Sequence, residues 1–100
     1  MSELKIVLHA PTPGALTRAR SNATNLRNAE PNAQIRIVAN GEAINQAVAE
    51  RDAGTDECLV LCNNSLKKKA LEAPEGIEVT TAGILLLAQL QQEGWIYIRA

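Results

Sequence analysis

The sequence is poor in aromatic residues: among 100 residues there is no phenylalanine, and only Trp95 and Tyr97 are aromatic. Proteins that bind single-stranded nucleic acid stack bases on several aromatic rings, and this chain has too few of them. Acidic and basic side chains also nearly balance, giving a net charge of -1. Because duplex-binding proteins present a basic face, we expect no nucleic acid partner.

Long apolar runs are missing as well. The longest, AGILLLA around Ile84, is much shorter than the roughly 18 residues that a membrane span requires. Residues 1–8 contain an acidic residue and too short an apolar run for a signal peptide. We therefore expect a cytoplasmic protein with no membrane partner. Two cysteines in a reducing compartment do not predict a disulfide scaffold.

The composition itself is that of a globular domain, with 46% hydrophobic and 21% charged residues, and the length suits a single domain over residues 1–100. Short apolar runs alternate with amphipathic stretches. The apolar runs predict strands at 4–9, 34–39, 57–62, 77–80 and 95–98. The intervening stretches predict four helices, at 13–29, within 41–54, from 63 or 64 to 71, and at 82–93. Asn63 or Asn64 is the expected N-cap of the third helix. Gly54 is the expected left-handed C-terminal cap of the second.

Strands that alternate with helices through short connections are typical of a parallel sheet covered on both faces. We therefore predict an α/β fold, a three-layer α/β/α sandwich with a five-stranded, mainly parallel sheet. In open parallel sheets, ligands bind beyond the carboxyl ends of the strands. The carboxyl ends of the predicted strands carry His9, Asn40, Cys62 and Thr80-Thr81, so these side chains are expected at one edge of the sheet.

Cys62 is the strongest candidate for chemistry at that edge. A thiolate is the reactive form of cysteine, and a helix N-terminus lowers a thiol pKa through its backbone amides and its dipole. The alternative interpretation is that Cys62 is a small buried hydrophobic residue at a strand end. Cys58 lies four residues earlier, about 13 Å away along a strand, whereas a disulfide needs α-carbons within about 7 Å. Cys58 is therefore expected in the core.

The other polar candidates each have a structural alternative. His9 is a candidate base or ligand-binding residue, or a histidine with purely structural hydrogen bonds. Arg18, Asn22 and Asn25 form a stripe on the first helix that either contributes to a site or interface or is only polar surface. The run Lys67–Lys69 is either a solvated face or a surface that attracts anions.

Several kinds of site have no signature in this sequence. One histidine and two separated thiols give no metal-ligand spacing. There is also no glycine-rich phosphate loop, no Ser-His-Asp order and no paired-carboxylate feature. We expect no metal and no cofactor.

The helix predicted at 82–93 is apolar around most of its circumference. Its large apolar residues are Ile84, Leu85, Leu86, Leu87 and Leu90. A helix that is apolar nearly all round requires burial on two sides. A partner subunit contacting this helix, joined by Trp95 and Tyr97, is one interpretation; complete burial within the monomer is the other.

Five segments, taken together, resemble the DsrE/DsrF-like family: KIVLHA, SNATNL, IVANG, LCNNSL and IEVTTAGILLLAQLQQEGWIYIR. They run in order through nearly the whole chain. The resemblance implies an α/β/α fold on a five-stranded sheet and homo-oligomers, often trimers or hexamers. It also implies a role in sulfur relay, in which a cysteine after the third strand receives and passes on sulfur as a persulfide.

That cysteine corresponds to Cys62, and His9, Asn40 and Asn64 match recurrent positions of small family members. Small relatives often carry acidic residues after the first strand, where this chain has Pro11–Gly14. The resemblance makes a sulfur-carrier or sulfurtransferase-like protein the leading hypothesis. The backbone amides of Asn63–Leu66 would stabilise the anionic sulfur, and sulfur donor and acceptor proteins would be its partners. Two alternatives stay open: a non-catalytic module in a homo-oligomer that binds a small anion or a nucleotide-like ligand, and a purely structural homo-oligomer.

Overall fold

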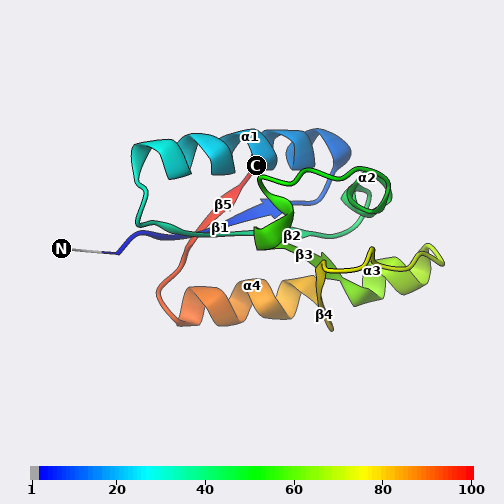
Figure 1. Ribbon diagram of the computed structural model, residues 1–100. Helices are drawn as coiled ribbons and strands as arrows, with labels where there is room; N and C mark the ends of the chain where they lie inside the picture. The colour runs from blue at the N-terminus through cyan, green and yellow to red at the C-terminus, as the bar shows by residue number, and fades with distance from the viewer. Residues whose placement is uncertain (1–2) are drawn as a thin grey trace.

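A single parallel sheet forms the centre of the computed structural model, which describes residues 3–100 (Figure 1). Its five strands are β1 (Lys5–Ala10), β2 (Gln34–Ala39), β3 (Leu59–Cys62), β4 (Glu78–Thr80) and β5 (Ile96–Arg99). They are ordered β4-β3-β2-β1-β5, and every neighbouring pair is parallel. The predicted α/β fold is confirmed, and the sheet is parallel throughout.

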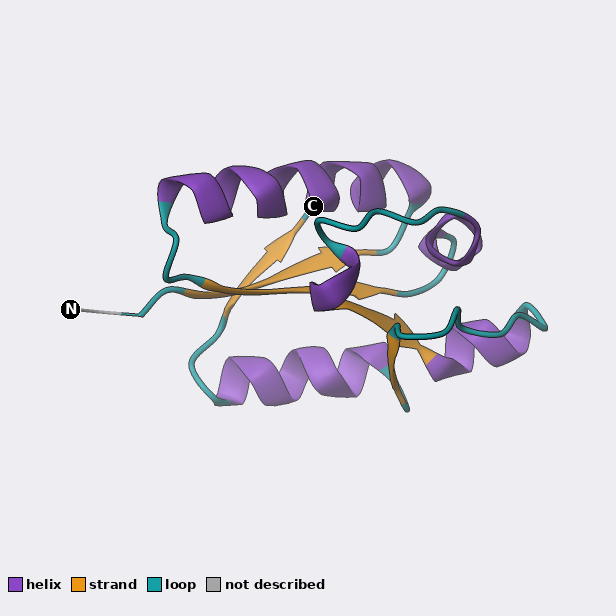
Figure 2. Cartoon of the chain, viewed as in Figure 1, coloured by secondary structure: helices purple, strands orange, loops and turns teal. Residues whose placement is uncertain are grey.

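Helices cover both faces of this sheet (Figure 2). They are α1 (Pro13–Ala29), α2 (Ala43–Ala49), α3 (Asn63–Lys68) and α4 (Gly83–Gln92), with a short 3-10 helix, η1 (Asp56–Cys58). In Figure 1, α1 lies above the sheet, with α2 on the same side, and α4 lies below it. The arrangement is the predicted three-layer sandwich.

The alternation of side chains along each strand divides the core in two. On the α1 side, Leu8, Ile37 and Leu61 belong to a large apolar cluster that includes residues of α1 and α2. On the α4 side, a smaller cluster consists of Val7, Val38, Val60, Leu87 and Leu90. His9 and Cys62 follow the parity of this second cluster, so both side chains belong to the α4 face.

The first helix forms as the sequence predicts. Thr12 is its N-cap, with the Oγ1 of that residue accepting a hydrogen bond from the Ala15 amide at 3.1 Å, and Pro13 occupies the first turn. Leu16, Ala19 and Ala23 are fully buried on one stripe. Small alanines on this stripe allow α1 to pack closely on the sheet.

The second helix is shorter than predicted, and Gly54 does not cap it. It ends at Ala49, and Gly54 does not adopt a positive φ. The Arg51 guanidinium accounts for this early end because it donates hydrogen bonds to the carbonyls of Ala47 and Val48. A side chain therefore takes the place that was assigned to a glycine cap.

The third strand begins later than predicted. Residues 57 and 58 belong to η1, and only Leu59–Cys62 is extended. The Cys58 thiol donates to the Thr55 carbonyl at 3.3 Å and is half-buried against the large core. The prediction that Cys58 lies on the strand was wrong. Both cysteines are nevertheless free.

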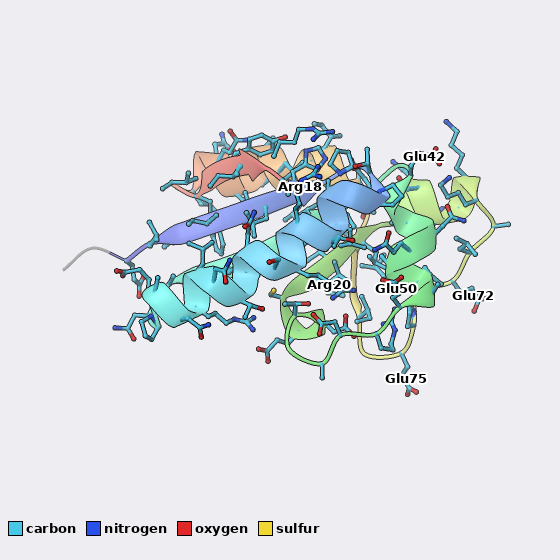
Figure 3. The ribbon with its side chains drawn as sticks, turned by 90° about the horizontal axis from the view of Figure 1, so that it is seen from above. Arg18, Arg20, Glu42, Glu50, Glu72 and Glu75 are labelled. Carbon is cyan, nitrogen blue, oxygen red and sulfur yellow. The ribbon has the colours of Figure 1, made fainter. Side chains whose placement is uncertain are left out.

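Arg20 anchors the segment that precedes β3. Its Nη1 donates to Thr55 Oγ1 at 2.7 Å and to Asp56 Oδ1 at 2.9 Å. Thr55 is completely buried, and its hydroxyl donates to Asp52 Oδ2 at 2.5 Å. Figure 3, seen from above α1, shows Arg20 on the side of the helix facing this loop. The network fixes where β3 starts and hence where it ends.

The third helix differs from the prediction at both ends. Cys62, not Asn63 or Asn64, is its N-cap residue, and the helix stops at Lys68 rather than at 71. It stops there because Ala70 takes a left-handed φ of 54°, while the Leu71 amide bonds to the Leu66 carbonyl at 3.0 Å. That bond is characteristic of a helix C-terminus closed by a left-handed residue.

The last helix packs one face on the sheet and leaves apolar side chains outside. Leu87 and Leu90 are buried, whereas Ile84 is 71% exposed and Leu85 51%. The edge strand β5 is exposed along its whole length. Among the helices within residues 3–100, none is both long and apolar enough to cross a membrane.

Candidate functional site

The register of the strands determines which polar groups meet at the carboxyl edge. Ala39 pairs with Leu61, so the next residues, Asn40 and Cys62, leave the sheet side by side. Cys62 pairs in turn with Thr80 of β4. His9 pairs with Val38, two residues before Asn40. His9 and Cys62 are separated by two strand spacings of about 4.8 Å and by two residues along the strand, at a rise of about 3.3 Å each. Their α-carbons are therefore about 12 Å apart.

Cys62 occupies the point where β3 becomes α3. Its backbone is extended, with φ -77° and ψ 118°, and the residue is 5% exposed. The protonated thiol makes no capping hydrogen bond. Burial opposes ionisation, but the Gly83 amide, the Ser65 hydroxyl and the amides of Ser65 and Asn64 favour the thiolate, and together they hold the pKa of Cys62 below its ordinary value.

Gly83, the first residue of α4, makes this arrangement compact. A Cβ added to Gly83 would lie 3.3 Å from the Cys62 Cβ, 3.4 Å from Val38 Cγ1 and 3.6 Å from the Asn40 Cβ. Any side chain at this position would displace its neighbours. The absence of one lets the backbone of α4 approach the sulfur, so amides from two different helices face Cys62.

Ser65 links the thiol to the loop after β2. Its Oγ accepts a hydrogen bond from the Gly41 amide at 2.9 Å, and Gly41 has a φ of 57°. Because the oxygen is held by that amide, its own hydrogen is available to the sulfur of Cys62. Ser65 therefore positions one donor at the thiol from the first turn of α3.

His9 is coupled to Asn40 and Tyr97, not to the thiol. Its Nε2 lies 3.0 Å from Asn40 Oδ1, and its Nδ1 lies 2.6 Å from the Tyr97 hydroxyl. An amide oxygen only accepts, so Nε2 carries a proton and donates to Asn40; with a neutral imidazole, the Tyr97 hydroxyl donates to Nδ1. The Asn40 side chain is thereby fixed, with its Nδ2 left to donate at the edge beside Cys62.

Asn63 and Asn64 lie in the first turn of α3, where Asn63 is half-buried and Asn64 is exposed. The Asn64 contribution to the thiol comes from its backbone amide. The expectation that amides following the cysteine face its sulfur agrees with this geometry. The side chains of Asn63 and Asn64 form no hydrogen bond with Cys62 in the described part of the chain.

Asn22 and Asn25 lie away from this edge cluster. They line a groove of about 360 Å³ with Leu8, Leu26, Ala29 and Ile98. Leu8 and His9 are consecutive on β1 and therefore point to opposite faces of the sheet. The two asparagines of α1 thus lie across the sheet from His9, and Arg18 of the same stripe donates to the Ala100 carbonyl at 3.5 Å.

Three participants were not predicted from the sequence: the hydroxyl of Ser65, Gly83 and the hydroxyl of Tyr97. Ser65 follows Cys62 by three residues, the spacing at which an N-cap side chain meets the third helical residue, so a signal was present. Gly83 and Tyr97 reach the site only through the packing of α4 and the pairing of β5 with β1. No group of three His, Cys, Asp or Glu side chains suited to a metal occurs within residues 3–100.

The fold and edge cluster define an open, parallel α/β protein with a cysteine at the carboxyl end of its third strand. No protein-family model and no curated protein matches the sequence. The structure of MTH1491, a protein of unknown function from Methanobacterium thermoautotrophicum, matches with a TM-score of 0.84 and 22% sequence identity. The match covers 98% of this chain and 100% of that one, which shows a shared fold.

Proposed function

We propose that the protein is a sulfur carrier of the DsrE/DsrF-like type that holds persulfide sulfur on Cys62. The observation that carries the proposal is the set of donors around this thiol. Amides of Asn64, Ser65 and Gly83, with the Ser65 hydroxyl, favour the thiolate over the thiol and so lower the pKa of Cys62. A purely structural cysteine at a strand end needs no such donors.

The proposed reaction is an exchange of sulfur between thiols with no net oxidation. The Cys62 thiolate attacks the outer sulfur of a donor persulfide, R–S–SH, forming a new S–S bond as the donor leaves as the thiolate R–S⁻. An acceptor thiolate then attacks the outer sulfur of Cys62–S–SH and regenerates the Cys62 thiolate. Cys62 is only 5% exposed, so a small inorganic polysulfide is the most accessible donor.

Asn40 and His9 have supporting roles in this proposal. The Nδ2 of Asn40 is the donor we assign to the outer sulfur, because Asn40 and Cys62 leave neighbouring strands at the same level. His9 positions Asn40 through the 3.0 Å bond to its Oδ1, and Tyr97 holds His9 from the other side. His9 is therefore a positioning residue. A cytoplasmic location belongs to the same proposal, since a reducing compartment keeps both cysteines free.

Incubation with inorganic polysulfide tests the proposal directly. Intact mass spectrometry is expected to show added sulfur on the native protein and on Cys58→Ser, and none on Cys62→Ser. Dithiothreitol should remove the added mass, since persulfides are reducible. No adduct, or an adduct that persists in Cys62→Ser, would contradict the proposal. Cys58→Ser is the matched control because it removes the thiol that does not lie at the sheet edge.

A homo-oligomer is the second part of the proposal, supported by the exposed apolar side chains of α4. Ile84 and Leu85 are more than half exposed, which is unusual for adjacent large aliphatic residues. Leu86 is only partly exposed, Leu90 is buried, and Trp95 packs on the smaller core. The contact surface proposed for a second subunit is therefore Ile84 with Leu85, rather than Leu86 with Leu90.

Replacing Ile84 and Leu85 together by aspartate is expected to reduce the assembly to monomers, since two charges would be buried in an apolar contact. Light scattering coupled to size exclusion gives the mass of each species. Asn45→Asp, exposed on α2 on the other side of the sheet, is the control for added charge and should keep the native mass. A native protein that is monomeric at high concentration, or a double variant of unchanged mass, rules out this interface.

A further inference from the structure

A second hollow shares Ser65 with the cysteine site and lies between the loop after β2 and the segment of α3. It has a volume of about 310 Å³ and is lined by Gly41, Glu42, Ser65, Lys68 and Lys69. This volume is at the lower end of the range for pockets that bind small molecules. Neither the sulfur chemistry nor the proposed subunit contact uses Lys68 or Lys69.

The charges in the hollow suit an oxyanion. Lys69 Nζ already lies 3.3 Å from Glu42 Oε1, so the lysine is oriented to hold a carboxylate oxygen there. The Glu42 side chain is 76% exposed, and an exposed ion pair contributes little stability. A ligand can therefore displace this carboxylate into solvent at small cost. Lys68 forms no ion pair with any residue that the structure describes, so the hollow carries a net positive charge.

Ser65 belongs to both the hollow and the cysteine site. Its oxygen accepts from the Gly41 amide at 2.9 Å, which leaves a single hydroxyl hydrogen to donate. That hydrogen is one of the groups that favour the thiolate of Cys62. An oxyanion in the hollow would be a second acceptor for the same hydrogen.

We propose that this hollow binds a small oxyanion of the phosphate class through Lys68, Lys69 and the Ser65 hydroxyl, and that binding slows the reaction of Cys62 with electrophiles. Two physical effects act in the same direction. The anion competes for the Ser65 hydrogen, and its negative charge opposes formation of the neighbouring thiolate. The equilibrium coupling is reciprocal: the factor by which a bound anion disfavours ionisation of Cys62 is the factor by which a Cys62 thiolate weakens binding of the anion.

Inorganic phosphate is the probe for binding, and methyl methanethiosulfonate is the probe for the thiol. At pH 7, with chloride added to keep ionic strength constant, calorimetry should detect phosphate binding to one site per chain. Saturating phosphate should slow modification of Cys62 about fivefold, near the lower limit of typical coupling between sites. Modification of Cys58 should not change.

Variants assign the effect to the hollow. Replacing Lys68 and Lys69 together by glutamine should abolish both the heat of binding and the slower modification. Lys67→Gln removes one positive charge from the same lysine run, but Lys67 does not line the hollow, so this variant should behave as the native protein. Glu42→Gln removes the internal competitor and should tighten binding.

Three outcomes would overturn the inference: no binding heat up to tens of millimolar phosphate, equal binding by the double lysine variant, or binding that leaves the Cys62 rate unchanged. The calorimetric result does not depend on the proposed function. A protein that binds phosphate but takes up no sulfur from polysulfide would retain this site and lose the sulfur-carrier proposal. A protein that takes up sulfur but binds no phosphate would retain the sulfur-carrier proposal and lose this site.

Discussion

Cys62 is expected to react with a small thiol reagent at pH 7 faster than Cys58, because the thiolate is the reacting form and its fraction at a given pH rises as the pKa of the thiol falls. The environments of the two thiols act in opposite directions. Burial dominates at Cys58 and raises the pKa of its thiol despite the positive charge of Arg27. At Cys62, burial is outweighed by the donors from Gly83 and Ser65, which lower the pKa.

The sign of each shift determines the pH profile. The lowered pKa of Cys62 means that its thiolate is already populated below the ordinary range near 8.5, so its rate should level off early as the pH rises. The raised pKa of Cys58 means that its rate should continue to increase above that range. Methyl methanethiosulfonate is small enough to report on both thiols.

Two single-cysteine variants provide the assignment. Cys58→Ser leaves only Cys62, and Cys62→Ser leaves only Cys58, so each rate is measured alone by mass spectrometry. In concentrated urea the two rates should converge, since both shifts depend on the folded structure. An inflection for Cys62 at or above that of Cys58 in the folded protein is incompatible with the donor arrangement. Ser65→Ala should move the Cys62 inflection upward.

Leu61→Ala should destabilise the protein by about 3 kcal/mol, within the range for leucine removed from a core. Leu61 is completely buried and belongs to the larger cluster. Leu61 lies on β3, and the neighbouring strands β2 and β4 hold the backbone of β3 on both sides. The surrounding structure can therefore collapse little into the cavity that the substitution leaves. Urea unfolding followed by circular dichroism measures the loss, which at a slope of about 1 kcal/mol/M shifts the midpoint by about 3 M.

Val79→Ala is the matched control for this substitution. Val79 is the register partner of Leu61, on the same face and at the same level, but on the edge strand β4, where it is 42% exposed. Its truncation should cost less than about 1 kcal/mol, since little apolar area returns to water. Similar losses for the two variants would mean that β4 is covered in solution by another chain.

The order of strands and helices could be predicted because each element has its own local signature. Thr12 and Pro13 mark the start of α1, and the short apolar runs mark buried strands. Helix ends were predicted less well. Arg51 closes α2 through hydrogen bonds from its side chain, and Ala70 closes α3 in a conformation that alanine rarely adopts. Neither an arginine nor an alanine at these positions predicts the end of a helix from the sequence.

The grouping of His9, Asn40 and Cys62 at one edge follows from parallel strands alone, and the structure brings all three to that edge. The face of the sheet that each helix covers could not be predicted from the strand pattern. Asn22 and Asn25 share a helical stripe but lie on the other face from His9. Gly83 and Tyr97 reach the edge cluster through contacts distant in sequence, which no local pattern contains.

The position of β5 beside β1 also has a consequence for how the chain folds during synthesis. His9 of β1 pairs with Arg99 of β5, so one side of β1 stays without its partner until residues 96–99 have been made. Pairings this distant in sequence form slowly because the entropy of closing a long loop is lost before any contact forms. The nascent chain therefore exposes an unpaired strand edge until β5 arrives, and such an edge can pair with another chain.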